Sequence, residues 1–348
     1  MADRLSWGIL ATGYIAEVFA KAVAESRTGK AVAVGSRSLA KAEAFGEKHG
    51  VPKRHGTYEA LLADENVEVV YIATPHPMHA EWAIKAAAAG KHVLCEKPIG
   101  MNHAEAMAIV DAAKQHDVFL MEAFVCRCHP QTAKLVELIR EKVIGEVRLI
   151  QASLGFHAPF DPEHRLLNNA MGGGSILDVG CYCVSMARLI AGVAQGKDFA
   201  DPLEATGAGH IGETTRVDEW VVATMKFPGG ILADLSAGVQ LQLDNALRIY
   251  GTEGYIHVPD PWLPGAEGTP VRLFLHKRHD NTPEEILVEA PAGPYSIEID
   301  TVAEHIAGRQ AAAPAMTWAD SLGNMKALDL WRERINMVYN SEKLESVH

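Results

Sequence analysis

The feature that most constrains the fold is a repeated alternation of short apolar runs and helical patterns in the first third of the chain. The strand-like runs are LSWGILA, AVAVGS, VEVVYIAT, HVLCEK and VFLMEAF, and a helical pattern follows each of the first four. Strands separated by helices of this length imply right-handed crossovers and a parallel sheet. We therefore predict an α/β, doubly wound domain over residues 1–123.

The pattern changes after a predicted helix at residues 131–141. Alternating strands joined by turn signals such as FPGG and GTEG follow: EVRLIQASLGF, VDEWVVATMKF, GILADLSAGVQ, LRIYGTEGYIHV and VRLFLHK. Alternation of this kind is typical of an antiparallel sheet. Between the first two strands, a glycine-led segment predicts a helix over 176–190, and further helices are predicted over 297–307 and 318–338. Residues 124–348 therefore form a second predicted domain.

Composition narrows the class of protein. The 348 residues, 48% of them hydrophobic, fit two domains better than one. A net charge of -12 without long like-charge runs argues against nucleic acid or an anionic membrane as the main partner. We find neither a signal peptide pattern nor an apolar stretch of membrane-spanning length, so we expect a cytoplasmic protein without a membrane partner.

The cysteines predict no disulfide framework, because there are only five of them in a long chain. Two Cys-x-Cys pairs, Cys126/Cys128 and Cys181/Cys183, have a narrower spacing than metal sites normally use. We therefore predict reduced thiols and no metal.

The segment ATGYIA, Ala11 to Ala16, follows a strand and opens a helix. It matches the dinucleotide fingerprint, with alanine in place of the first glycine. Gly13 would let the backbone approach a pyrophosphate, and the helix amino terminus would favour its charge. The alternative is a tight turn that binds no ligand.

The end of the second predicted strand discriminates between cofactors. An NAD-preferring site usually places a carboxylate there, whereas this chain has Ser36 and Arg37, with Lys41 one helical turn further on. These side chains can hydrogen-bond a 2'-phosphate. We therefore predict NADP(H) as the preferred cofactor, with NAD(H) possible; the alternative is that Arg37 lies on the adenine or projects into solvent.

Several motifs together resemble those of the glucose-fructose oxidoreductase and inositol dehydrogenase family. They are the ATGYIA turn, Ala73-Thr74-Pro75 with His79, Glu96-Lys97-Pro98, and Gly172-Gly173-Gly174 followed by Asp178 and Tyr182. The segments MEAFVCRCHPQ and GGGSILDVGCY are most similar to the branch that contains dimeric dihydrodiol dehydrogenases and xylose dehydrogenases.

The resemblance implies a Rossmann domain followed by a substrate-binding and oligomerisation domain with a large, mostly antiparallel open sheet. It also implies that Lys97 lies beside nicotinamide and substrate, with Glu96 as its partner. The cofactor-binding residues implied by the fingerprint and the resemblance are Ala11, Thr12, Gly13, Tyr14, Ile15, Ser36, Arg37, Lys41, Ala73, Thr74, Pro75, His79, Glu96 and Lys97.

Within this resemblance we assign catalysis to Lys97, Tyr182 and Asp178. Asp178 and Tyr182 are four positions apart, so on a helix they share a face. We expect Tyr182 to exchange a proton with a substrate hydroxyl while cationic Lys97 lowers the tyrosine pKa and stabilises alkoxide character. Asp178 would hold a substrate hydroxyl or orient Lys97. Without the resemblance, we would favour a core tyrosine and an ion-paired aspartate as the explanation of these two residues.

Further substrate contacts are expected from two segments. Arg127 follows the fifth strand, in an Arg-x-His-Pro pattern typical of the family, and its alternative is a surface ion pair. His157, Arg165 and Asn169 belong to a polar loop before the glycines. The full predicted substrate-binding set is Lys97, Arg127, His157, Arg165, Asn169, Asp178 and Tyr182.

The resulting hypothesis is an NADP-dependent dehydrogenase or reductase that acts on a cyclic sugar, a sugar derivative or a dihydrodiol, as a homodimer or homotetramer formed through the second sheet. One alternative is a glycosidase or lyase whose tightly held NAD(H) takes a hydride and returns it. Another is a non-catalytic, dinucleotide-sensing protein, which would not need Lys97, Asp178 and Tyr182 together.

Overall fold

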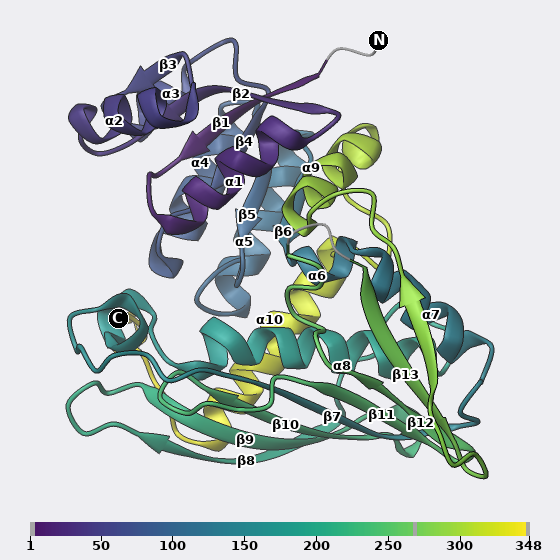
Figure 1. Cartoon of the computed structure of the whole chain (residues 1–348). Helices are drawn as coiled ribbons and strands as arrows, with labels where there is room; N and C mark the ends of the chain where they lie inside the picture. The colour runs from purple at the N-terminus through teal and green to yellow at the C-terminus, as the bar shows by residue number, and fades with distance from the viewer. Residues whose placement is uncertain (1–3, 267–269, 346–348) are drawn as a thin grey trace.

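A six-stranded parallel sheet forms the amino-terminal part of the molecule (Figure 1). The structure is a computed structural model that describes residues 4–266 and 270–345. The strand order is β3-β2-β1-β4-β5-β6. In chain order, the elements are β1 Leu5–Leu10, α1 Tyr14–Glu25, β2 Gly29–Gly35, α2 Leu39–His49, β3 Lys53–His55, α3 Tyr58–Leu62, β4 Val69–Ile72, α4 His79–Ala88, β5 His92–Glu96, α5 His103–Gln115 and β6 Leu120–Ala123.

The apolar runs become strands because helices cover both faces of this sheet. Every residue of β4 is buried, as the absence of alternation in its sequence requires. The strand order reverses between β1 and β4, so the crossovers leave this sheet on opposite faces there. Open α/β sheets bind ligands at the carboxyl ends of the strands beside such a switch point. The predicted Rossmann architecture is confirmed.

The second sheet has eight strands in the order β14-β13-β12-β11-β7-β10-β9-β8. All its neighbouring strands are antiparallel except β7 and β10, which are parallel. The mostly antiparallel sheet is thus confirmed. Its strands and the short helices before it are α6 Val125–Cys128, α7 Pro130–Arg140, β7 Val147–Gly155, β8 Glu204–Ile211, β9 Asp218–Lys226, β10 Leu232–Gly238, β11 Leu247–Gly251, β12 Gly254–Val258, β13 Val271–Lys277 and β14 Glu284–Val288.

The remaining helices join the two sheets. α8 (Cys181–Val193) and α10 (Trp318–Arg334) lie on the face of the second sheet that points toward the parallel sheet, and α11 (Asn340–Glu345) follows α10 (Figure 1). α9 (Pro294–His305) packs against α1. There the buried Asp300 carboxylate accepts hydrogen bonds from the hydroxyls of Ser26 and Thr28, both at 2.7 Å. The last third of the chain therefore contributes to both halves of the molecule.

Three features differ from the predictions. β3, β8 and β14 were not predicted, because β3 has three residues, β8 is rich in small residues, and β14 is a short polar edge strand. The helix predicted from residue 176 begins with a π-helical turn, Ile176–Gly180. The last predicted helix ends at Arg334 rather than at 338.

One apolar segment is longer than predicted. Asn169–Val193 has the length and hydropathy of a membrane span, with a mean hydropathy of 1.6. However, 94% of its most apolar window is buried inside the protein. The prediction that no apolar stretch reaches membrane-spanning length is therefore wrong, and burial explains the apolar character of this segment as that of a core helix.

Candidate active site

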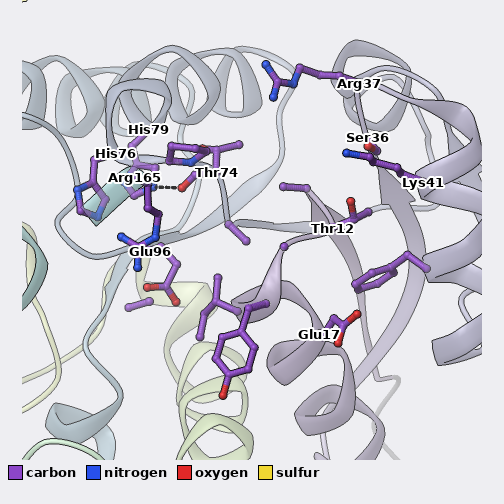
Figure 2. A pocket seen from close by; sticks show the side chains of 18 of the residues that line it. Thr12, Glu17, Ser36, Arg37, Lys41, Thr74, His76, His79, Glu96 and Arg165 are labelled. Carbon is purple, nitrogen blue, oxygen red and sulfur yellow. Dashed lines mark hydrogen bonds between the residues drawn. The ribbon is translucent and has the colours of Figure 1, made fainter. Parts of the chain in front are cut away.

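A cavity of about 1200 Å³ extends across the carboxyl ends of the parallel strands. Figure 2 shows Thr12, Ser36, Arg37 and Lys41 at one end and Thr74, His76, His79, Glu96 and Arg165 at the other. We call these the cofactor end and the substrate end. The predicted residues in the cavity wall are Ala11, Thr12, Gly13, Tyr14, Ile15, Ser36, Arg37, Lys41, Ala73, Thr74, Pro75, His79, Glu96, Lys97, Arg165, Asp178 and Tyr182.

The cofactor end begins at the turn between β1 and α1. Gly13 is the N-cap of α1, and a Cβ atom added to it would meet nothing within 4 Å. The open space and the backbone N–H groups of the helix terminus suit a pyrophosphate. Ala11, in contrast, has a φ of 97°, a conformation that favours glycine and is strained for alanine.

The end of β2 supplies positive charge. Ser36 is buried, whereas Arg37 and Lys41 are exposed side chains of the cavity wall. Tyr58 lies beside Arg37; burial raises the pKa of Tyr58, and the Arg37 guanidinium opposes the rise. Within the described wall of this end, Glu17 is the only carboxylate, and it pairs with Lys48 at 2.8 Å. This end of the cavity therefore carries a positive charge that can bind the phosphates of a dinucleotide.

His79 connects two loops at the substrate end of the cavity. Its Nδ1 and Nε2 atoms each lie 2.8 Å from a carbonyl oxygen, those of Pro98 and Thr74 respectively. Two acceptors favour an imidazolium, but burial, supported by nearby Lys97, lowers the pKa of His79 overall. A buried ring thus ties the loop after β4 to the peptide that carries Lys97.

Lys97 lies directly after β5, and the Lys97–Pro98 peptide bond is cis. The Lys97 Nζ atom donates a hydrogen bond to the Asp178 carbonyl oxygen at 2.6 Å and lies 3.9 Å from the Asp178 carboxylate. Arg165 donates to the same carboxylate at 2.8 Å. Burial alone would raise the pKa of Asp178, but these two cations hold it well below its usual range. Asp178 is therefore an ionised group that orients two cations.

Tyr182 differs from the expectation in one respect. The Lys97 Nζ atom lies 5.0 Å from the centroid of the Tyr182 ring, so the two side chains adjoin as predicted. Burial nevertheless raises the pKa of Tyr182 well above its ordinary value, and Tyr295 and Glu96 add to the rise. The predicted lowering of the Tyr182 pKa does not occur in this structure, because desolvation of the phenol is the largest cause of the shift. The tyrosine is a protonated donor here.

Glu96 lies on the inner side of Lys97. Its carboxylate accepts a hydrogen bond from the Tyr71 hydroxyl at 2.5 Å and a longer one from the Lys97 backbone N–H at 3.3 Å. Burial raises the pKa of Glu96, although Lys97 opposes the rise. These contacts orient Glu96 in the wall of the cavity.

The structure places three predicted substrate contacts away from the cavity wall. Arg127 is 1% exposed and binds Asp320 at 2.5 Å and the Ser185 hydroxyl at 2.7 Å, so it is a buried structural ion pair and not a surface one. Asn169 is buried, and its side-chain amide donates a hydrogen bond to the Arg216 carbonyl and accepts one from the Asn340 N–H. His157 forms an isolated bridge with Gln240 beside the second sheet.

The cavity also contains residues that sequence reasoning missed. Tyr295 reaches it from α9, and His164 precedes Arg165 in the loop before the glycines. His76 is buried and its pKa is lowered to about 3, by burial first and then by His79. Local sequence offers no signal for Tyr295, whereas His164 adjoins a predicted residue. The other unpredicted wall residues are Glu17, Ser38, Ala44, Phe45, Lys48, Tyr58, Ala123 and Val125.

The cysteines surround the site without entering its wall. Cys126, Cys181 and Cys183 are buried, all five thiols are free, and burial raises the pKa of Cys126 to about 12. Among the residues that the structure describes, no group of three or more potential metal ligands gathers. Small apolar packing explains these side chains.

Comparisons with known proteins agree with this geometry. Residues 5–124 match the model of an oxidoreductase family with an NAD-binding Rossmann fold, and residues 132–257 match the GFO/IDH/MocA C-terminal domain. Trans-1,2-dihydrobenzene-1,2-diol dehydrogenase of Mus musculus is 38% identical, over 75% of this chain and 76% of its own, and that of Homo sapiens is 34% identical over the same shares.

Solved structures show the same architecture. The 3-ketoreductase KijD10 from Actinomadura kijaniata, in complex with NADP and TDP-benzene, superposes with a TM-score of 0.84 at 25% identity, covering 96% of this chain and 98% of its own. The aldose-aldose oxidoreductase from Caulobacter crescentus gives the same TM-score and coverage at 24% identity. By its fold, cavity and sequence, the chain belongs to the GFO/IDH/MocA family of NAD(P)-binding oxidoreductases.

Proposed function

We propose that this oxidoreductase uses NADP(H) to interconvert a hydroxyl and a carbonyl group on a cyclic sugar, a sugar derivative or a dihydrodiol. The observation that carries the proposal is that Lys97, Asp178 and Tyr182 face the same cavity as the amino terminus of α1. The cavity thereby combines a proton donor, Tyr182, and a cation, Lys97, with a helix terminus that can bind the phosphates of a dinucleotide. The relatives named for dihydrodiols and aldoses support this substrate class.

The proton is assigned to Tyr182. Bound nicotinamide supplies or accepts the hydride at its C4 carbon. In the direction of carbonyl reduction, the Tyr182 hydroxyl gives its proton to the substrate oxygen, and its raised pKa keeps that proton in place until the oxygen becomes basic. Lys97 stabilises negative charge on the same oxygen, while Asp178 and Arg165 fix the position of its ammonium group.

The preference for NADP(H) rests on the end of β2. Arg37 and Lys41 are exposed in the cavity wall and neither forms an ion pair among the residues that the structure describes. A 2'-phosphate would provide the missing negative charge. NADP is also the cofactor named for the KijD10 complex.

We further propose a cytoplasmic homo-oligomer assembled through the outer face of the second sheet. Trp220, Val222 and Leu232 are 39–48% exposed on that face, and no helix of the described chain packs there. Apolar surface of this kind is typical of an interface. Light scattering on the purified protein should give the mass of a dimer or tetramer, and Val222→Glu should reduce it; a wild-type monomer would contradict the proposal.

The decisive test of function is the absorbance of NADPH while the protein is offered aldoses, anhydrosugars, inositols and dihydrodiols with NADP, and with NAD in parallel. We expect NADPH to accumulate with one substrate class, and Tyr182→Phe to abolish this while binding NADPH normally. Accumulation only with NAD would contradict the cofactor assignment. Full activity of folded Tyr182→Phe would contradict the role of the tyrosine.

A further inference from the structure

The glycine run, Gly172 to Gly174, fixes the geometry of the substrate end. The Gly174 N–H donates to the Leu166 carbonyl at 2.9 Å, and a Cβ atom on Gly173 would lie 2.6 Å from the Arg165 carbonyl oxygen. The run is therefore folded directly onto the loop that carries Arg165. It also leads without interruption into the π-helical turn that carries Asp178. Any shift of these glycines would move Asp178, which binds Lys97, and Arg165, which binds Asp178.

Three buried side chains from distant parts of the chain hold this segment. The His76 Nδ1 atom lies 3.1 Å from the Gly172 carbonyl oxygen. The Tyr339 hydroxyl donates to the next carbonyl, that of Gly173, at 2.7 Å. The Asp218 carboxylate accepts from the Ile176 N–H at 2.7 Å. His76 belongs to the cavity wall, but Tyr339 and Asp218 do not, and both are 0% exposed.

Tyr339 is itself fixed by the segment that follows α10. Its backbone N–H donates to the Glu342 carboxylate at 3.1 Å, and Arg332 binds the same carboxylate at 2.9 Å through two nitrogens. The Asn340 N–H donates to the Asn169 side chain at 2.8 Å. Figure 1 shows the carboxyl-terminal end of the chain beside the loop that precedes α8. This contact explains why Asn169 is buried away from the cavity.

We propose that Tyr339 is a positioning residue for the active site. Its hydroxyl holds the glycine run, and the glycine run holds Asp178 and Arg165 in the arrangement that orients the Lys97 ammonium group. The inference rests on the proposed function, because it concerns the same site. Tyr339 acts without touching substrate or cofactor, so its removal should change turnover and leave cofactor binding intact.

The test compares Tyr339→Phe with a matched control, Thr132→Val. Thr132 also donates a buried hydroxyl to a backbone carbonyl, that of Cys126 at 2.6 Å, and it lies on α7 outside the cavity wall. We expect Tyr339→Phe to lower kcat at least tenfold while the Kd for NADPH changes less than twofold. The control should keep kcat within twofold. Equal kcat values for Tyr339→Phe and wild type would overturn the proposal, whatever the change in thermal stability.

A second measurement does not depend on turnover. Hydrogen–deuterium exchange should be faster in residues 172–178 of Tyr339→Phe than in wild type, with no change in α1. If wild type turns over no substrate but this difference appears, the proposed function fails and the positioning role stands. Unchanged exchange in 172–178 would overturn the role. Should Tyr339→Phe not fold, Glu342→Gln removes the anchor of Tyr339 and should lower kcat in the same direction; wild-type kcat in that variant would contradict the role.

Discussion

The two ends of the cavity are built in different ways. The cofactor end comes from turns at the carboxyl ends of neighbouring parallel strands, and each turn is a short continuous segment. The substrate end combines Lys97 of the parallel-sheet domain with Arg165, Asp178, Tyr182 and Tyr295 of later segments. One end is thus fixed by local backbone geometry, and the other by long-range contacts. This difference predicts that changes at the two ends should have separable effects.

The largest separation is expected from Lys97→Met, which keeps the length of the side chain and removes its charge. Loss of the cation that stabilises the reacting oxygen should lower kcat about a thousandfold, or about 4 kcal/mol of activation free energy. The Kd for NADPH, measured by fluorescence titration, should stay within about twofold of wild type. A large loss of NADPH binding would show that the two ends are not independent.

The converse change is Arg37→Ala at the cofactor end. Removing a charged hydrogen-bond donor from a phosphate should weaken NADPH binding about thirtyfold, or about 2 kcal/mol, with kcat preserved at saturating NADP. Binding of NADH should hardly change, because it has no 2'-phosphate. Arg140→Ala, an exposed arginine at the end of α7, is the control. Equal weakening of NADH and NADPH would place Arg37 elsewhere on the dinucleotide.

A smaller effect, on stability, is expected from a change at Asp218, which lies outside the cavity wall and accepts a hydrogen bond from the Ile176 N–H. Burial raises the pKa of Asp218 from 3.8 to about 7, despite the hydrogen bond from Ile176. The carboxyl's contribution to stability is therefore fully present below pH 3.8 and is lost as the pH rises through 7. Asp218→Asn should be more stable than wild type at pH 8 by about 1.5 kcal/mol, with a smaller difference at pH 5, in urea unfolding.

Glu122 is also buried, with a pKa raised to about 7, but it is present in both proteins and its effect cancels in the comparison. If the stability difference between Asp218→Asn and wild type did not depend on pH, Asp218 would not titrate in this range.

The smallest change tests the cofactor end alone. Because Ala11 has a φ of 97°, Ala11→Gly should relieve strain and raise the free energy of unfolding by about 1 kcal/mol. The same substitution at Ala16, which is buried inside α1, should instead lower it by about 1 kcal/mol. Denaturant unfolding of both variants checks the sign. Destabilisation by Ala11→Gly would mean that the methyl group packs more favourably than the strain costs.

The same contrast explains what the sequence could predict. The turn from Ala11 and the side chains after β2 are contiguous segments, so a pattern of a few residues predicted their place in the cavity wall. The loop from Ala73 is also contiguous, but its place was implied by the resemblance. Lys97, Asp178 and Tyr182 were reached only through a resemblance, because nothing local distinguishes them from a surface lysine and a core helix. Their presence in one cavity is a property of the folded chain.

Long-range partners account for the errors. Arg127 lies on α6, shortly after the end of β6, but its carboxylate partner Asp320 lies 193 positions away. No local pattern predicts Tyr295, because α9 is placed by its packing on α1. There Asp300 accepts hydrogen bonds from Ser26 and Thr28, which lie near the start of the chain. The pKa of Tyr182 is raised and not lowered as predicted, because sequence does not reveal how strongly the fold desolvates a phenol.

The contact between Tyr339 and Gly173 has a consequence for the newly made chain. During synthesis the amino-terminal part emerges first, and the strands that form the cofactor end are complete once Ala123 has been added. The residue that holds the glycine run is added only after α10. We therefore expect a chain still attached to the ribosome to acquire the capacity to hold a nucleotide before it acquires the capacity to turn over a substrate.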